Sequence, residues 1–343
     1  MQTRYIKYRL AAIGCAMVLT ISTMAQILPN LGGQRAGLSA LSFLKNDINP
    51  RSFAMGGASV AISGDEFSTH TNPSGVADLQ SFSLATSNFF VGAGINQSFI
   101  SATLPLTSSS GLGLSINSLT SGAMEVRTEF QPEGTGQKIY ASNVAAGLTY
   151  SNRLSDMFTM GVTLKYINER LAEYTNHTAT FDLGFTYQTD FKNLAFAVMV
   201  QNFSGNSGLE GDFLAVDFNR AGTVNVEEYT APTVFRMGAS MTALEKDNHE
   251  VTVSFELQHP NDNAENFRFG AEYSYLKLIY FRTGIRLNVD GQQFPSIGVA
   301  LRHRVGGHPL HLNYTVLPTQ IMGTQHVVGL GFRINKDLKN DRD

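Results

Sequence analysis

Three histidines near the C-terminus are the first residues of this sequence that could bind a metal ion. His303, His308 and His311 lie around a short Gly-Gly turn. Imidazole nitrogens are common metal ligands, but such sites combine several ligands at characteristic spacings. No carboxylate has a matching spacing here. We therefore expect a solvated turn, with no metal and no cofactor.

Other candidates for catalysis are equally weak. The stretch Ser-Gly-Asp-Glu-Phe at 63–67 resembles the motif of cyclic-dinucleotide synthases. That motif belongs on a hairpin inside a cytoplasmic α/β domain, whereas here it follows an export signal, so we interpret it as a chance match. No Ser-His-Asp order stands out from the many serines. We therefore expect no enzyme activity.

Residues 1–25 have the pattern of a cleaved signal peptide. A basic start (Arg4, Lys7 and Arg9) precedes the apolar run LAAIGCAMVLTIS, and small residues allow a cut after Ala25. The apolar run is too short for a membrane anchor, which is the alternative interpretation. Cleavage also removes Cys15, the only cysteine, and so excludes thiol chemistry and disulfides. The mature chain keeps 22 Lys and Arg against 28 Asp and Glu, a mild acidity that argues against nucleic acid as a partner.

The rest of the chain is dominated by alternation with a period of two. In EVTVSFELQ, the apolar residues from Val251 to Leu257 share one face, and Glu250, Ser254 and Glu256 lie on the other. This pattern indicates strands. No later run of about 20 apolar residues exists, which excludes a helical membrane protein. We expect fourteen strands near 81–90, 96–105, 110–118, 140–151, 157–171, 177–189, 193–203, 232–243, 248–258, 265–275, 279–288, 294–304, 309–317 and 325–334.

These segments have the length of strands that cross a bilayer at a tilt, roughly 9–11 residues. If the chain enters the first strand from the periplasm, the turns on that side are all short, and the two long loops, 119–139 and 204–231, both lie on the outer side. Outer-membrane barrels sort their loops in this way. We predict an all-β fold, a 14-stranded antiparallel transmembrane barrel with a small N-terminal hatch. A soluble β-sandwich or lipocalin-like barrel fits less well, because the second face carries Gly, Ser, Thr and charges.

We divide the chain into a signal peptide (1–25), an N-terminal extension and hatch (26–80), the barrel (81–335) and a charged C-terminal tail (336–343). Within the hatch we expect a short strand at 53–63 and a short helix capped by Asp65. The hatch turn is Asn72, Pro73, Ser74 and Gly75, where Pro73 fixes a bend and Gly75 allows a positive φ.

Many charged residues fall in the inward register of the predicted strands. Such a lumen would hold water and ion pairs, or a plug. We expect most of these charges to pair across the lumen, and a specific anion path is the sharper alternative. The predicted lumen network is Arg236, Arg268, Arg282, Arg286, Arg302, Arg304, Arg333, Asp182, Glu250, Glu256 and Glu272.

The N-terminal block FLKNDINPRSFAMGGASVAISGDEFSTHTNPSGVADL (43–79) resembles the start of the PorV/PorQ family of outer-membrane barrels. That family is similar to the long-chain fatty-acid transporters, whose hatch has an Asn-Pro-Ala element matched here by Asn72, Pro73 and Ser74. The resemblance implies a non-enzymatic accessory barrel of type IX secretion. Shuttle members carry Asn-Pro-Ala-Lys and an aromatic residue where this chain has NPSGVA, which leaves open whether this chain is a shuttle or an anchor.

Two functions follow from this resemblance. In the first, the long outer loops bind a protein partner, which could be a translocon barrel, secreted cargo or a surface attachment component. The candidate contacts are Phe130, Phe213, Phe218 and Tyr229. In the second, the barrel transports small hydrophobic molecules through a side opening. Outer-membrane lipid surrounds the barrel in both, and lipid or detergent could occupy the lumen.

Overall fold

The computed structural model describes residues 39–211, 227–292 and 294–334. The predicted signal peptide, the charged tail, and Phe213 and Phe218 in the second long loop lie outside these residues. Among the described residues, no helix is long and apolar enough to cross a membrane.

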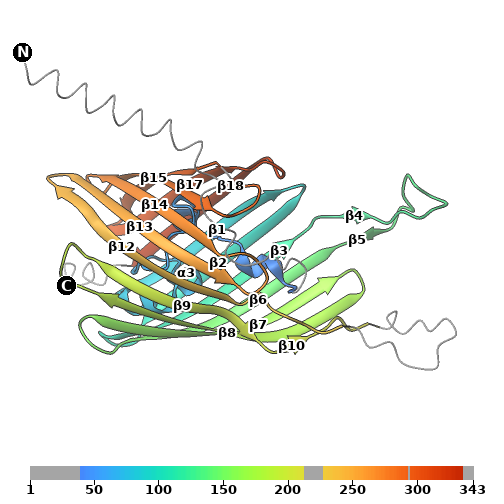
Figure 1. The fold of residues 1–343 in the computed structure, drawn as a ribbon, viewed down its shortest axis with the longest axis horizontal. Helices are drawn as coiled ribbons and strands as arrows, with labels where there is room; N and C mark the ends of the chain where they lie inside the picture. The colour runs from blue at the N-terminus through green and yellow to red at the C-terminus, as the bar shows by residue number, and fades with distance from the viewer. Residues whose placement is uncertain (1–38, 212–226, 293, 335–343) are drawn as a thin grey trace, which may run out of the picture.

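Fourteen antiparallel strands of the described chain close into one barrel (Figure 1). Closure comes from the first and last strands, which pair from Phe82 opposite Ile334 to Phe90 opposite His326. The fold predicted from the alternation is confirmed, with strand ends shifted by a few residues. The strands are β1 (Phe82–Gly92), β2 (Ile95–Pro105), β3 (Ser110–Thr120), β6 (Ala141–Arg153), β7 (Phe158–Leu171), β8 (Tyr174–Gln188), β9 (Ala195–Ser204), β12 (Val234–Lys246), β13 (His249–Pro260), β14 (Asn266–Tyr275), β15 (Ile279–Leu287), β16 (Ser296–Val305), β17 (His308–Pro318) and β18 (Thr324–Ile334).

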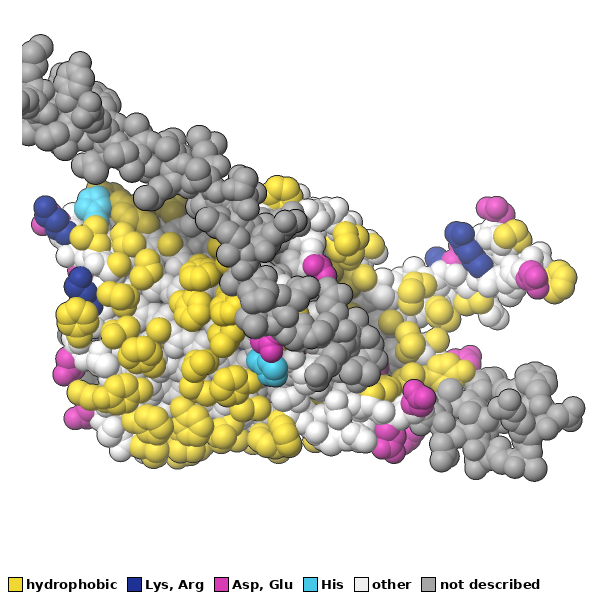
Figure 2. All heavy atoms as spheres, viewed as in Figure 1, with side chains coloured by type: hydrophobic (Ala, Val, Ile, Leu, Met, Phe, Trp, Pro, Cys, Tyr) yellow, Lys and Arg dark blue, Asp and Glu magenta, His cyan; other side chains and the backbone are white. Residues whose placement is uncertain are grey.

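The alternation separates an apolar outer wall from a polar lumen. On β13, Val253 and Phe255 face outward, whereas Ser254 and Glu256, which alternate with them along the strand, are buried inside. Apolar side chains cover most of the visible wall, and charged side chains gather at its ends and on the loops (Figure 2). A closed barrel pairs every strand, so the wall leaves no sheet edge unsatisfied in hydrocarbon.

The two ends of the barrel differ in loop length. One end has only short connections, of which 189–194 is the longest; we call it the short-turn end. The other, the long-loop end, carries 121–140 and 205–233. The first of these contains the hairpin β4 (Met124–Glu125) and β5 (Lys138–Ile139), which projects from the barrel (Figure 1). The second contains β10 (Asn206–Ser207) and β11 (Tyr229–Thr230). The predicted sorting of the loops is confirmed.

Residues 42–79, which we call the hatch, fill the lumen with short helices: η2 (Ser42–Lys45), α2 (Pro50–Ala54), α3 (Ser68–Thr71) and η3 (Pro73–Asp78). Asn49 caps α2, since its side chain accepts a hydrogen bond from the Arg51 N–H, and Pro50 occupies the first turn. The short strand predicted at 53–63 is wrong, because α2 and turns occupy this stretch. The buried backbone there bonds to carbonyls within the hatch and to side chains of the wall, rather than to a neighbouring strand.

A β-bulge interrupts the pairing of β8 with β9. The register shifts between Phe181 and Leu183, and Asn202 opposite has a φ of 58°. Asp182, fully buried, accepts hydrogen bonds from the Asn202 N–H at 2.7 Å and from Lys165 Nζ at 2.9 Å. Asp182 therefore satisfies both a backbone group freed by the bulge and a buried ammonium.

Replacing Asp182 by alanine should destabilise the barrel by about 3–5 kcal/mol, because the Asn202 N–H loses its partner and Lys165 loses its carboxylate and keeps only Asn202 Oδ1. Urea unfolding followed by far-UV circular dichroism measures this loss. Asp156→Ala, in an exposed turn, is the matched control and should stay within about 0.5 kcal/mol of wild type. Equal stability of the two variants would contradict this role for Asp182.

Candidate functional site

The hatch crosses the whole lumen. At the long-loop end, Leu41, Phe43 and Leu44 pack with Ala145 and Ile167 of the wall. At the short-turn end, the side chain of Gln80 donates to the carbonyl of Ser108, and Arg153 pairs with Asp78 at 2.7 Å. The chain therefore enters the lumen at the long-loop end and leaves it at the start of β1.

The turn Asn72–Pro73–Ser74–Gly75 lies inside the barrel, against β6, β7 and β8. Asn72 Oδ1 accepts from the Ser74 N–H at 3.1 Å, and Asn72 Nδ2 donates to the carbonyl of Val60 at 2.8 Å. The Ser74 hydroxyl lies 2.7 Å from that of Thr186 on β8, and Ser151 donates to the Ser74 carbonyl. This turn joins two parts of the hatch to the wall.

Gly75 does not have the positive φ that we expected. It lies in η3, where a Cβ would approach the Ser68 hydroxyl to 2.9 Å. Its small size, rather than backbone freedom, is what this position requires. Asp65 accepts a hydrogen bond from the Phe67 N–H at 2.8 Å just before α3, and α3 ends before Pro73.

Glycines of the wall allow the hatch to approach the strands closely. A Cβ on Gly184 of β8 would lie 2.1 Å from Asn72 Oδ1. A Cβ on Gly284 of β15 would lie 2.0 Å from the carbonyl carbon of Met55. Real Cβ atoms do not approach other atoms so closely. At these two positions the wall therefore cannot carry a side chain while the hatch is in place.

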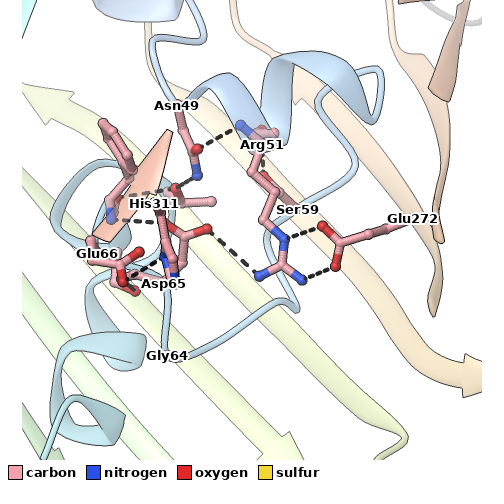
Figure 3. Close-up of polar contacts among 12 residues, drawn as sticks. Asn49, Arg51, Ser59, Gly64, Asp65, Glu66, Glu272 and His311 are labelled. Carbon is pink, nitrogen blue, oxygen red and sulfur yellow. Dashed lines mark hydrogen bonds and ion pairs between the residues drawn. The ribbon is translucent and has the colours of Figure 1, made fainter. Parts of the chain in front are cut away.

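One ion-pair group joins α2 to β14 and β15 (Figure 3). Arg51 donates to both carboxylate oxygens of Glu272, at 2.9 Å from Nε and 2.5 Å from Nη2. Arg282 donates from Nε to the same carboxylate at 2.5 Å. Burial alone would lower the pKa of Arg51, but the charges of Glu272 and Asp65 outweigh it and raise this pKa. Arg51 is thus a cation that fixes α2 to the wall.

A second group joins the loop before α3 to β17 and β18. Glu66 accepts hydrogen bonds from Arg333 Nε and from His311 Nδ1, the latter at 3.0 Å, and Arg333 Nη2 donates to the carbonyl of Gly64 at 2.6 Å. Burial opposes ionisation of Glu66, but the hydrogen bond from His311 and the charge of Arg333 hold its pKa well below the usual range. Glu66 is therefore an ionised anchor of the hatch. We call the Arg51–Glu272 and Glu66–Arg333 contacts the latch.

A third group lies nearer the long-loop end. Glu256, fully buried on β13, accepts from the N–H groups of Ser59 and Val60, each at 2.9 Å. The same carboxylate pairs with Arg236 of β12 at 2.7 Å, and Arg236 donates to the carbonyl of Thr71. One wall ion pair thus binds the hatch backbone at two separate places.

The hatch lies between two of the cavities on the lumen side; a third, of about 380 Å³, lies at the short-turn end beside Asp78 and Arg153. The outer cavity, about 540 Å³, faces the long-loop end and is lined by Asp47, Arg268 and Arg286 among others. The inner cavity, about 270 Å³, lies toward the short-turn end and is lined by residues that include Arg302 and Lys277. The two share no lining residue. The hatch lies between the two.

The predicted lumen charges behave unequally. Arg236, Arg282, Arg333, Asp182, Glu256 and Glu272 all take part in the ion pairs described above. Arg268 and Arg286 line the outer cavity, and Arg302 and Glu250 line the inner one. Glu250 pairs with Lys277 at 3.5 Å. Arg304 is instead exposed beside the short turn at 306–307, since the strand ends there.

The three histidines do not form one cluster. His311 points into the lumen and contacts Glu66, whereas His303 is exposed and His308 packs edge-on against Phe332. The described residues hold no group of three or more His, Cys, Asp or Glu that could bind a metal ion.

Two of the predicted partner residues are described. Phe130, at the tip of the projecting hairpin, is 92% exposed. Tyr229 instead donates to Glu169 at 3.2 Å, which fixes β11 to the barrel rim. Burial and the charge of Glu169 raise the pKa of Tyr229 to about 12. Tyr229 is therefore less available to a partner than Phe130.

The sequence did not identify most of the hatch residues that form ion pairs with the wall. Arg51, Asp65 and Glu66 lie in the stretches that identified the family resemblance, but no charge role was assigned to them. The signal was present, since these are charged residues within a segment of small and apolar residues. His70, which lines the outer cavity, was also missed. Its burial, together with the charges of Lys165 and Arg236, lowers its pKa to about 3, so it is neutral at pH 7.

The fold is similar to that of three solved barrels. The toluene transporter TodX of Pseudomonas putida has a TM-score of 0.56 at 12% identity, covering 88% of this chain and 99% of TodX. The CymD monoaromatic hydrocarbon channel (0.54, 12%) and a Pseudomonas aeruginosa FadL homologue (0.53, 9%) each cover 83% of this chain and 97% of their own. No protein-family model and no curated protein sequence matches the chain. The fold is thus that of FadL-type barrels, and the resemblance to PorV/PorQ finds no support in these comparisons.

Replacing Gly184 by valine should displace the Asn72–Pro73 turn from the wall, because the added Cβ occupies the position of Asn72 Oδ1. The sequence has no cysteine after Cys15, so Thr69→Cys, at a buried hatch position, provides a thiol probe. We expect this thiol to be protected in the parent and to react readily with maleimide in the Gly184→Val variant.

Gly205→Val is the matched control, since a Cβ there meets no atom within 4 Å. It should leave the thiol of Thr69→Cys protected. If Gly184→Val also left it protected in a folded barrel, the close docking of the hatch would be wrong.

Proposed function

We propose that this chain is an outer-membrane barrel that passes small molecules across the outer membrane, with the hatch as its gate. Export follows from the predicted signal peptide, and the apolar wall suits a bilayer. The observation that carries the proposal is the position of the hatch between the outer and the inner cavity, where ion pairs join it to the wall. Apolar contacts hold it as well, since Ile48, Phe53 and Phe67 pack with Phe89 and Phe99 of the wall. The ion pairs and hydrogen bonds are the contacts that can exchange with water or solute.

The named neighbours support transport over catalysis, since they are called transporters or channels for toluene and monoaromatic hydrocarbons. The route here differs from the side opening that we considered from the sequence. Every neighbouring pair of barrel strands is hydrogen-bonded. The register shifts of β1 with β2, β8 with β9 and β12 with β13 each have paired residues on both sides, so the ladders continue past them. We therefore place the route through the lumen, past the hatch.

A protein-binding barrel of type IX secretion is the second candidate. It is favoured by the projecting β4–β5 hairpin with the exposed Phe130, a large aromatic residue of the kind that often anchors interfaces. Co-purification of a large barrel protein or a surface protein with the intact chain from membranes would favour it over transport.

Weakening the latch should open the gate. Liposomes that contain the purified wild-type barrel should swell slowly in a solution of a neutral sugar of the size of glucose. The double variant Arg51→Gln/Glu66→Gln should swell at least about tenfold faster, since each 1.4 kcal/mol lost from the closed state raises the open fraction about tenfold.

Arg304→Gln, at an exposed arginine outside the latch, should swell like the parent. Heat-modifiable migration on a gel shows that each variant is folded. If the folded latch variant swelled at the parental rate, transport through a hatch held by these ion pairs would be refuted.

A further inference from the structure

Two arginines of the outer cavity have no carboxylate of the described residues within ion-pair distance. Arg268 donates from Nε to the side chain of Asn266 at 2.8 Å, and its guanidinium packs against Gly57. Arg286 donates to the carbonyl of Gly56 at 2.9 Å and to Gln292 at 2.8 Å. Its Nη2 is buried and has no hydrogen-bond partner among the described residues.

The other charged residues of this cavity have partners of their own. Arg236 is already paired with Glu256, and Lys45 at the rim is paired with Asp262 at 2.6 Å. Asp47 faces the same cavity, where it accepts hydrogen bonds from Ser52 and from the Asn49 N–H. Burial raises the pKa of Asp47, although the charge of Arg286 opposes this rise. Asp290 also lines this cavity. What the cavity offers a ligand is therefore the unpaired guanidinium donor of Arg286, with Arg268 beside it, rather than an excess of positive charge.

The uncharged lining is polar on one half and apolar on the other. Side-chain amides, among them Gln201, Gln258, Gln292 and Gln325, contribute the polar half. The apolar half consists of Leu44, Phe53, Phe89, Val91, Val234, Pro260, Ala264 and Val289. A volume of about 540 Å³ is in the range of small-molecule sites. This lining suits a compact ligand with several hydrogen-bonding groups and is unsuited to a long hydrocarbon chain.

A guanidinium group binds carboxylates through two parallel hydrogen bonds, and an unpaired buried donor carries a free-energy cost that such a ligand removes. We propose that the outer cavity binds a small hydrophilic carboxylate, with Arg268 and Arg286 as its anchors. This rests on the proposed function, because it names the class of substrate that enters the same lumen.

The test compares the binding of two sugars that have the same ring and nearly the same size. Isothermal titration calorimetry of the purified full barrel measures binding of glucuronate and of glucose, which differ in the carboxylate. We expect glucuronate to bind at least about tenfold more tightly, and hexanoate to bind more weakly than glucuronate. Arg268→Gln/Arg286→Gln should reduce the difference between the two sugars to less than about twofold.

Arg302→Gln, which removes an arginine of the inner cavity, should keep the full preference. Equal binding of the two sugars, tighter binding of hexanoate, or a preference that survives in the double variant would each overturn the proposal. The latch experiment uses a neutral sugar, so its outcome is independent of this one. Faster swelling of the latch variant without a preference for glucuronate would refute only the carboxylate site. A preference for glucuronate without faster swelling would refute only the role of the hatch as a gate.

Discussion

The inward carboxylates of the barrel wall are the feature on which the rest of the structure depends. Glu256 and Glu272 each bind an arginine of the wall and a group of the hatch at the same time. A buried carboxylate with only one of these partners would be left with unsatisfied oxygen atoms in a low-dielectric lumen. The wall and hatch are therefore stable together, and the hatch is part of the barrel interior rather than a separate domain.

The same arrangement is compatible with the transport that we propose for this plugged barrel. Polar contacts join the hatch to the wall at several places, and cavities lie on both sides of it. Polar contacts can exchange partners with water or with a charged solute, so a ligand in the outer cavity could compete for hatch contacts such as that of Arg286 with Gly56. The apolar contacts of the hatch at Leu41, Phe43 and Leu44 keep its start in place at the long-loop end.

The sequence predicted the barrel well because a period of two is a local property. It placed Phe255 outward and Glu256 inward, and both positions are as expected. It did not reveal the bulge at Asp182 and Asn202, since a single extra residue leaves the alternation on either side intact. Nor could it pair Arg51 with Glu272, which lie 221 residues apart. The strand expected at 53–63 failed because the wall, rather than a neighbouring strand, satisfies that backbone.

The central claim is that the hatch is docked in the lumen in the membrane, and one cross-link tests it most directly. The hydroxyls of Ser74 and Thr186 lie 2.7 Å apart, one on the hatch and one on β8. In Ser74→Cys/Thr186→Cys, mild oxidation of isolated membranes should remove both thiols from reaction with maleimide, and reduction should restore them. Two thiols that still react freely after oxidation, in a folded barrel, would contradict the account.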